Sequence, residues 1–312
     1  MAATKSIKKT EQQKQGAGKK GGSLMSFRKQ QLFTIIVFLA IPTALLLLFT
    51  YVPLVQMVRW SFTDWRGYTE MNFVGLKNYI RIFTRKEFWD VFKVSIYYFI
   101  GSLVQIAVAL YFATIFFYKL AGKNFFKGVL FFPSLLNGVA IAFIFQYFFK
   151  QGGTLDTVVS WFGVPQESIP LWIGNTAIIN ISLTFISVWR YMGQNMVLFA
   201  GATQSVGMDY FEAAALDGAN KWQQFRYLIL PSIRDVVLLN VILSVKGAIS
   251  VYETPYIMTM GSGGSETFVI KALNTAFTQN QIGLACAMGV VLLIITMIVT
   301  FVQQAVFAEK ED

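Results

Sequence analysis

The sequence predicts an all-α, polytopic membrane protein with six transmembrane helices. Only 13% of its 312 residues are charged, against about 25% in a typical soluble domain. The mean hydropathy of +0.55 excludes an ordinary soluble enzyme and a disordered chain. Several uncharged runs are long enough to cross the hydrocarbon core as helices, which takes about 20 residues. Because these runs are continuously apolar and do not alternate, a closed β-barrel is excluded.

Six such runs follow one another along the chain. The fourth run is interrupted only by Arg190, the fifth is apolar from Val236 to Tyr252 apart from Lys246, and the others are uncharged. Pro133 is expected to kink the third helix, because proline lacks the N–H that the helix ladder needs. Between the first two runs, the external loop 59–93 combines tryptophans with an amphipathic pattern, which predicts an interfacial helix. The predicted spans are about 32–58, 94–118, 128–149, 175–201, 234–252 and 281–306.

The distribution of Lys and Arg predicts that both termini lie in the cytoplasm. Residues 1–30 hold eight of the 26 Lys and Arg and one acid, Glu11, and are expected to form a disordered, solvated basic tail that fixes the orientation of the chain. A site for membrane lipid within this tail is the alternative. With this tail inside, cytoplasmic segments hold 15 Lys and Arg and external segments hold nine, which follows the positive-inside rule. The short end 309–312 is then cytoplasmic as well. Since the tail accounts for +7 of the net charge of +10, no nucleic-acid partner is expected.

The cytoplasmic loop 202–233 is expected to form two short helices about a turn. Asp217-Gly218 is a turn signal, and the alanines before it favour a helix. The residues that predict the helix ends are two pairs with capping-box spacing, Asp209 with Glu212 and Asn220 with Gln223, and the closing Pro231.

The same loop carries a motif. Seven of its residues match the pattern E-A-A-x-x-D-G-A followed, about a dozen positions later, by proline: Glu212, Ala213, Ala214, Asp217, Gly218, Ala219 and Pro231. The loop therefore resembles the "EAA" loop of ABC-importer permeases. The segments 61–65, 73–79, 131–133 and 256–264 resemble permeases of the carbohydrate-uptake type. Within that type, the chain is similar to the maltose- and glycerol-3-phosphate-type subunits, which begin with one extra helix before a five-helix core.

This resemblance implies a type I ABC importer transmembrane architecture and a set of partners. These are a second homologous permease subunit, two ATP-binding subunits and an extracytoplasmic substrate-binding protein that delivers a carbohydrate, all at a bacterial plasma (inner) membrane. The seven motif residues would couple this subunit to the ATPase. ATP and Mg would be bound by that ATPase, because the Gly16–Gly22 stretch lacks the spacing of a P-loop.

The chain itself is not expected to be an enzyme or to hold a cofactor. It has no His and a single cysteine, Cys286. No catalytic imidazole, disulfide or metal cluster is therefore expected.

Two cations, Arg190 and Lys246, lie within predicted spans at similar expected depths. An ionisable side chain there costs about 2.5–3.5 kcal/mol on insertion scales, so each must face a cavity, a partner or the protein interior. Their aromatic, amide and hydroxyl-bearing neighbours suit a sugar, which needs an apolar platform and fixed polar groups. The candidate residues of the substrate pathway are Trp189, Arg190, Tyr191, Gln194, Asn195, Lys246, Tyr252 and Glu253.

Three interpretations of the two cations stay open. They could hold helices together by pairing with acids of the partner permease or with backbone carbonyls. They could instead line the pathway and favour an anionic glycan. They could also donate hydrogen bonds to a neutral oligosaccharide.

A secondary transporter or channel for a polar solute is the main alternative function. Ion coupling would require an inverted repeat or carboxylates in the middle of the membrane. No Asp or Glu lies in the middle of a predicted span, which disfavours this class. An intramembrane enzyme is disfavoured further, because the chain has neither His nor paired intramembrane carboxylates.

Overall fold

The computed structural model describes residues 27–68, 70–118 and 121–308, which form helices joined by turns. Within these residues the only β-type pairing is an isolated bridge between Thr63 and Phe73. The all-α class is therefore confirmed for the part of the chain that the structure describes. Most of the predicted basic tail and the short carboxyl-terminal end lie outside it. The chain divides into two units, 1–56 and 57–312, which are described in turn.

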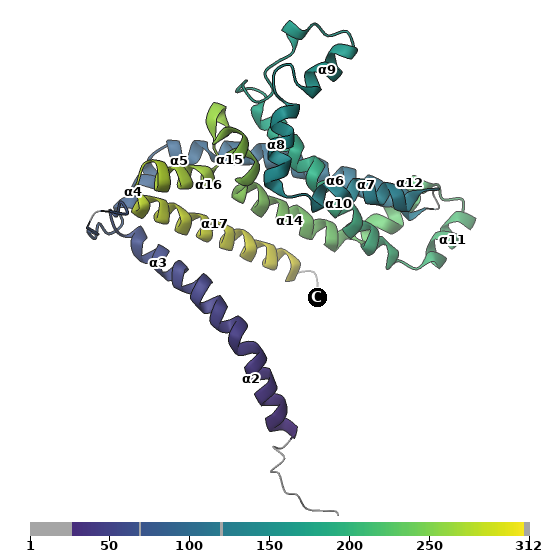
Figure 1. The fold of residues 1–312 in the computed structure, drawn as a ribbon. Coiled ribbons are helices and arrows are strands. Elements are labelled where there is room, and N and C mark those ends of the chain that lie inside the picture. Colours follow the sequence, from purple (N-terminus) through teal and green to yellow (C-terminus); the bar gives the residue numbers. More distant parts are fainter. Residues whose placement is uncertain (1–26, 69, 119–120, 309–312) are drawn as a thin grey trace, which may run out of the picture. The chain divides into compact units, whose positions relative to one another are not determined.

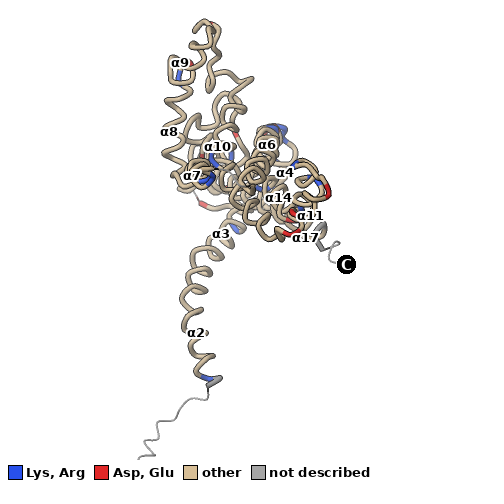
Figure 2. Tube along the Cα trace, turned by 90° about the vertical axis from the view of Figure 1, so that its right-hand side faces the viewer, with Lys and Arg blue, Asp and Glu red and all other residues tan. Residues whose placement is uncertain are grey.

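The first unit is built on a long apolar helix. α2 (Phe27–Leu46) continues through the π-helical turn η1 (Leu47–Tyr51) into α3 (Val52–Ser61). The helical stretch Lys29–Ser61 has 33 residues and is long enough to cross a membrane. Figure 2 shows α2 without charge over nearly its whole length. The helix begins inside the predicted tail 1–30, so the last residues of that tail are helical.

The second unit is organised around two long helices, α6 and α10, which pack along each other. α14 packs against α6 and α7 packs against α10, so that these helices lie side by side (Figure 1). Small residues of α6, such as Ala109 and Ala113, share one buried cluster with the bulky Met196 and Phe199 of α10. The four helices are α6 (Phe92–Phe117), α7 (Lys123–Leu135), α10 (Ile179–Gln204) and α14 (Arg234–Ser250).

The predicted amphipathic helix of the external loop is present as α4 (Lys77–Thr84). Ile82 is fully buried in a cluster with Met288. The Asn78 side-chain amide donates to the carbonyls of Ser61 and Thr63, both at 2.8 Å. These contacts attach α4 to the end of α3 and to α17 (Ile282–Ala308).

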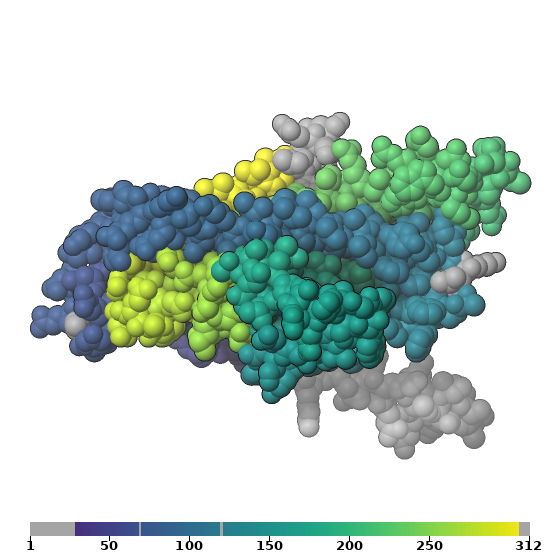
Figure 3. Space-filling model, turned by 90° about the horizontal axis from the view of Figure 1, so that it is seen from above, coloured from purple at the N-terminus to yellow at the C-terminus, as the bar shows by residue number. Residues whose placement is uncertain are grey.

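The segment after α14 returns to the beginning of α6. Phe268 of α16 (Phe268–Leu273) stacks on Phe92, with 4.8 Å between the ring centroids. Figure 3 shows the yellow-green residues of this segment beside blue α6. The remaining elements here are α5 (Glu87–Asp90), α15 (Glu253–Thr259), η4 (Ser262–Gly264) and η5 (Asn274–Thr278).

The third predicted span is not one continuous helix. α7 ends at Leu135, α8 (Gly138–Phe148) begins three residues later, and the two axes differ by 99°. The expected kink at Pro133 is therefore misplaced, because Pro133 lies inside α7. The break falls at Leu136, whose backbone is extended, and Asn137 then caps a new helix by accepting the Val139 N–H at 2.8 Å. Figure 1 shows α8 rising from the layer of long helices with α9 (Thr154–Trp161) beyond it.

Length and composition alone do not yield six spans. Among the described residues four helical segments are long and apolar enough to cross a membrane, and the bent pair α7–α8 would be a fifth. α10 has 26 residues and sufficient length, but it carries Asn180, Arg190, Gln194 and Asn195. Its polar residues therefore need a protein or cavity environment.

Two glycines of α10 test the packing of this helix against α7. A Cβ at Gly193 would collide with the backbone carbonyl of Leu130, whereas a Cβ at Gly201 would have no atom within 4 Å. We expect Gly193→Ala to lower the free energy of unfolding by about 1–3 kcal/mol, as overpacking does. Gly201→Ala is the matched control and should raise it by about 0.5–1 kcal/mol. Thermal unfolding of the purified subunit in detergent measures both, and equal effects would contradict the close approach of α7.

Candidate functional site

A cavity of about 540 Å³ lies between α6, α10 and α14 and reaches the beginning of α15. This volume is within the range of sites for small ligands. Its wall combines amide and hydroxyl side chains with aromatic rings, together with one cation and one carboxylate. The polar and aromatic side chains used below are Tyr98, Gln105, Thr184, Arg190, Tyr191, Gln194, Asn195, Asn240, Tyr252 and Glu253.

The charged groups of this cavity form an ion pair. Arg190 Nη1 lies 2.9 Å from Glu253 Oε2, and Arg190 Nη2 donates to the Leu136 carbonyl at 3.4 Å. The two charged residues are 63 positions apart in the sequence. Of the partners considered for Arg190 from the sequence, a backbone carbonyl is present, that of Leu136. The acid that pairs with Arg190 lies in the same chain.

This ion pair joins two interruptions in helices. Glu253 is the first residue of α15, which follows the break after α14. Leu136 lies in the break between α7 and α8, where its carbonyl has left the helix ladder. A Cβ at Gly138, the first residue of α8, would overlap the Glu253 carboxylate. Glycine at this position therefore lets the carboxylate approach the α8 backbone and reach Arg190.

The structure brings together six of the eight predicted pathway residues. Arg190, Tyr191, Gln194, Asn195, Tyr252 and Glu253 all line the cavity. Trp189 does not, because its ring packs into the buried cluster, 5.2 Å from the Phe145 ring centroid in an edge-on arrangement. Lys246 does not either: it is exposed on α14 while its neighbour Gly247 lines the cavity. Both residues adjoin a cavity-lining residue in the sequence, but successive side chains of a helix point about 100° apart, so the neighbour of a lining residue can face away from the cavity.

Sequence reasoning missed the polar residues that α6 and the start of α14 contribute. Gln105 and Asn240 line the cavity from helices that are otherwise largely apolar. In the sequence each of them is a single amide within an apolar run, and such a residue indicates a polar role inside the membrane. Among the described residues, the Tyr98 and Thr184 hydroxyls, which belong to cavity-lining residues, are buried without a hydrogen-bond partner. Such groups cost free energy unless water or a ligand satisfies them, which suits a polar ligand.

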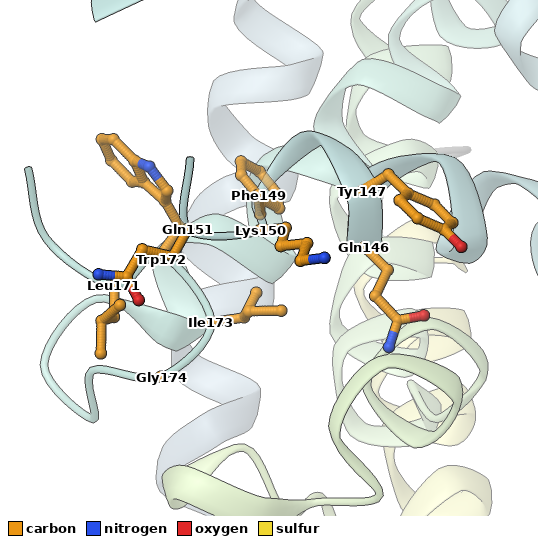
Figure 4. A pocket seen from close by; sticks show the side chains of 9 residues that line it. All are labelled: Gln146, Tyr147, Phe149, Lys150, Gln151, Leu171, Trp172, Ile173 and Gly174. Atoms are coloured by element: carbon orange, nitrogen blue, oxygen red, sulfur yellow. The ribbon is translucent and has the colours of Figure 1, made fainter. Parts of the chain in front are cut away.

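A second cavity, of about 470 Å³, lies at the end of α8 (Figure 4). It lies between the segment 146–151 and the turn 171–174. The buried Asp156 of α9 organises this region, because its carboxylate accepts from Trp172 Nε1 and from the Gly152 N–H, both at 2.7 Å. The short helix η2 (Gln166–Ser168) completes the loop. None of the predicted pathway residues lines this second cavity.

The motif loop folds as two short helices, as expected, but the start of the first differs from the prediction. α11 begins after Gly207 without a side-chain cap, so the predicted cap by Asp209 is wrong. The capping box of Asn220 and Gln223 is present, with hydrogen bonds of 2.9 and 2.8 Å. The second helix runs without interruption from Lys221 through η3 to Ser232, so it ends one residue after Pro231, close to where the proline predicts. The elements are α11 (Met208–Leu216), α12 (Lys221–Gln224), η3 (Phe225–Ile229) and α13 (Leu230–Ser232).

Six of the seven motif residues lie on α11 or in the turn that follows it, and the seventh, Pro231, lies in α13. Phe211 anchors this helix by packing on Phe117, with 4.7 Å between the ring centroids. Glu212 is exposed, and Leu216, one turn later on the same face, is 90% exposed. Gly218 has a φ of +82°, which a residue without Cβ adopts most easily, so the turn signal is confirmed. The other motif residues on and after α11 are Ala213, Ala214, Asp217 and Ala219. Ala213 and Asp217 are exposed and the two others are half-buried, while Pro231 of α13 is exposed.

Comparison with known proteins shows a family match and full-length relatives. Residues 105–310 match the family model described as "Binding-protein-dependent transport system inner membrane component". The chain is 31% identical to the "Probable ABC transporter permease protein YurN" of Bacillus subtilis (strain 168), over 87% of this chain and 95% of that protein. It is also 31% identical to the "Multiple sugar-binding transport system permease protein MsmF" of Streptococcus mutans, over 85% and 92%.

A solved structure shares the fold. A chain in the crystal structure of a bacterial alginate ABC transporter, in complex with an alginate pentasaccharide-bound periplasmic protein, superposes with a TM-score of 0.75. The superposition covers 89% of this chain and 95% of that one, at 15% sequence identity. At this identity the likeness concerns the fold alone.

Proposed function

Because the chain belongs to the family of binding-protein-dependent transport system inner membrane components, we propose that it forms half of the translocation pathway of an ATP-driven importer for an oligosaccharide. The cavity between α6, α10 and α14 is the observation that supports the substrate class. Its amides and hydroxyls match the hydroxyl groups of a glycan, and Tyr191 and Tyr252 offer aromatic surface. The relative MsmF is named as a permease of a multiple sugar-binding transport system, which points to the same class.

The proposal includes a second permease subunit, two ATP-binding subunits and an extracytoplasmic substrate-binding protein. The dependence on a binding protein is part of the family description. Two observations support α11 as the coupling helix that docks on an ATP-binding subunit: its match to the EAA pattern, and the exposure of Glu212 and Leu216. ATP and Mg would be held by that subunit, and this chain would contribute no catalytic group.

The proposed topology has six spans, with both termini in the cytoplasm of a bacterial cell. α10 serves as the fourth span because Arg190, Gln194 and Asn195 line the cavity. Asn180 is buried and donates to the Gly264 carbonyl. The bent pair α7–α8 serves as the third. The positive-inside bias of the sequence supports the cytoplasmic side for α11.

A secondary transporter is less well supported. Ion coupling would need an acidic residue in the pathway, and among the described residues that line the cavity Glu253 is the only one. Its carboxylate is already paired with Arg190 of the same chain, so it is not free to bind a coupling ion.

The test is ligand-stimulated ATP hydrolysis. We would reconstitute this chain with its neighbouring permease, the ATP-binding subunit and the binding protein in lipid, and add a panel of oligosaccharides. Stimulation by at least one oligosaccharide, together with uptake of it, is the expected result. Assembly of an active transporter without any ATP-binding subunit would overturn the proposal, as would stimulation by non-carbohydrate ligands only.

A further inference from the structure

From the Arg190–Glu253 pair we infer that this chain's wall of the pathway selects a neutral oligosaccharide and rejects an anionic one. The inference rests on the proposed function, since it requires that a glycan passes through the cavity between α6, α10 and α14. It concerns the charge of the substrate, which the sequence left open.

The first step is the charge inventory of the cavity. Among the described residues that line it, Arg190 and Glu253 are the only charged ones. Lys246, the second cation considered from the sequence, is not part of the wall. Because the two charges are 2.9 Å apart, they largely cancel at the distance of a bound ligand. The wall then offers dipoles, hydroxyls and amides without a net charge.

The second step is that the cation is shielded more than the anion. The Arg190 side chain is 14% exposed and the Glu253 side chain 39%. One terminal nitrogen of the guanidinium contacts Glu253, the other faces the Leu136 carbonyl, and the group lies 5.0 Å from the Tyr191 ring centroid. An incoming carboxylate would therefore meet the Glu253 carboxylate before the cation, and repulsion would oppose its binding. A sugar hydroxyl, in contrast, can donate a hydrogen bond to that carboxylate.

The third step is that the pair is held without a ligand. Gly138 leaves room for the carboxylate at the first residue of α8. This helix has 11 residues, and the partial positive charge at its N-terminus favours a nearby carboxylate. The ion pair is thus built into the meeting point of α8, α10 and α15, so a ligand has to bind in its presence.

The experiment measures equilibrium binding of defined probes to the membrane complex of both permease subunits and both ATP-binding subunits. The complex is in nanodiscs, and the binding protein is left out. Omitting the binding protein removes its own specificity from the result. The neutral probes are maltotriose and cellotriose, and the anionic probe is trigalacturonate. For the natural chain we expect a neutral probe to bind at least about ten-fold more tightly than trigalacturonate, which corresponds to about 1.4 kcal/mol.

Glu253→Gln should change the charge selectivity. The variant leaves Arg190 without its counter-charge, so the affinity for trigalacturonate should rise at least about ten-fold and should fall again with added salt. The affinity for the neutral probes should change much less. If Glu253→Gln impairs assembly, the double variant Arg190→Gln/Glu253→Gln is measured in its place; it keeps the wall neutral and should retain the preference for a neutral probe.

A matched control is available in the same chain. Glu266 and Lys271 form another partly buried ion pair, at 3.2 Å, with 29% and 16% side-chain exposure, and neither residue lines the cavity. Glu266→Gln should therefore leave the ratio of neutral to anionic affinity unchanged. An equal shift in this control would assign the effect to general perturbation and overturn the inference.

The other outcomes separate this inference from the proposed function. Equal or tighter binding of trigalacturonate by the natural chain overturns the neutral selection, as does failure of every probe to bind both the natural chain and Glu253→Gln. In either case the proposed function stands if an oligosaccharide-loaded binding protein still stimulates ATP hydrolysis. If no oligosaccharide stimulates hydrolysis, the proposed function itself fails.

Discussion

Glu212→Lys is expected to abolish oligosaccharide-stimulated ATP hydrolysis and transport while the subunit still assembles in the membrane. Glu212 is exposed on α11, in line with the 90% exposed Leu216 one turn later. If α11 docks on an ATP-binding subunit as proposed, reversing the charge of Glu212 removes a contact with that subunit and adds repulsion. Loss of a hot-spot contact of about 2 kcal/mol corresponds to about a 30-fold decrease, and the charge reversal should exceed it. Phe211, which anchors α11 on Phe117, is untouched by this change.

The measurement is the ligand-stimulated ATPase rate of the reconstituted importer, with size-exclusion profiles as evidence of folding. Asp209→Lys is the matched control, because Asp209 carries the same charge three positions earlier on α11, is exposed, and lies outside the motif. It should reduce the rate much less than Glu212→Lys. Normal transport by Glu212→Lys would show that α11 is not the coupling helix.

Arg190→Ala should produce the second large effect, a loss of stability accompanied by loss of transport. The change leaves the Glu253 carboxylate without its cation and the Leu136 carbonyl without a donor. Removing one partner of a buried pair costs about 3–5 kcal/mol. The 39% exposure of Glu253 lets water compensate part of that cost, so we expect about 2 kcal/mol here. Arg190→Lys should recover only part of the loss, because a single ammonium does not reproduce the two-pronged contact.

Lys246→Ala is the matched control for Arg190→Ala. Both cations interrupt an apolar run of the sequence, but Lys246 is exposed on α14 and outside the cavity. The thermal stability of the purified subunit in detergent should fall markedly for Arg190→Ala and little for Lys246→Ala. Equal effects would contradict the structural difference between the two cations.

Much of the fold was predictable because its signals are local. The start of α12 follows from the spacing of Asn220 and Gln223, and the turn before it follows from the conformational freedom of Gly218. α4 was predictable from its amphipathic pattern. The wrong predictions concern helix ends that the surroundings decide, such as the break at Leu136 and the uncapped start of α11 near Asp209.

The candidate site was predictable only in part. Arg190 and Gln194 share a helix face by their spacing of four residues, and both line the cavity. Trp189 was predicted to line the pathway because it adjoins Arg190 in the sequence, but its side chain packs into the core. The amide of Gln105 was missed because a single polar residue does not reveal which side of its helix faces other helices.

The sequence by itself determined the all-α membrane class, the motif around Glu212 and the presence of a cation in the fourth apolar run, because composition and local spacing carry this information. Only the tertiary structure decided that Arg190 is neutralised by Glu253, which lies 63 positions away. It also decided that Lys246 stays outside the cavity. These outcomes depend on how helices rotate about their axes and where they break. Contacts between segments that are distant in the sequence settle both, and no local pattern records them.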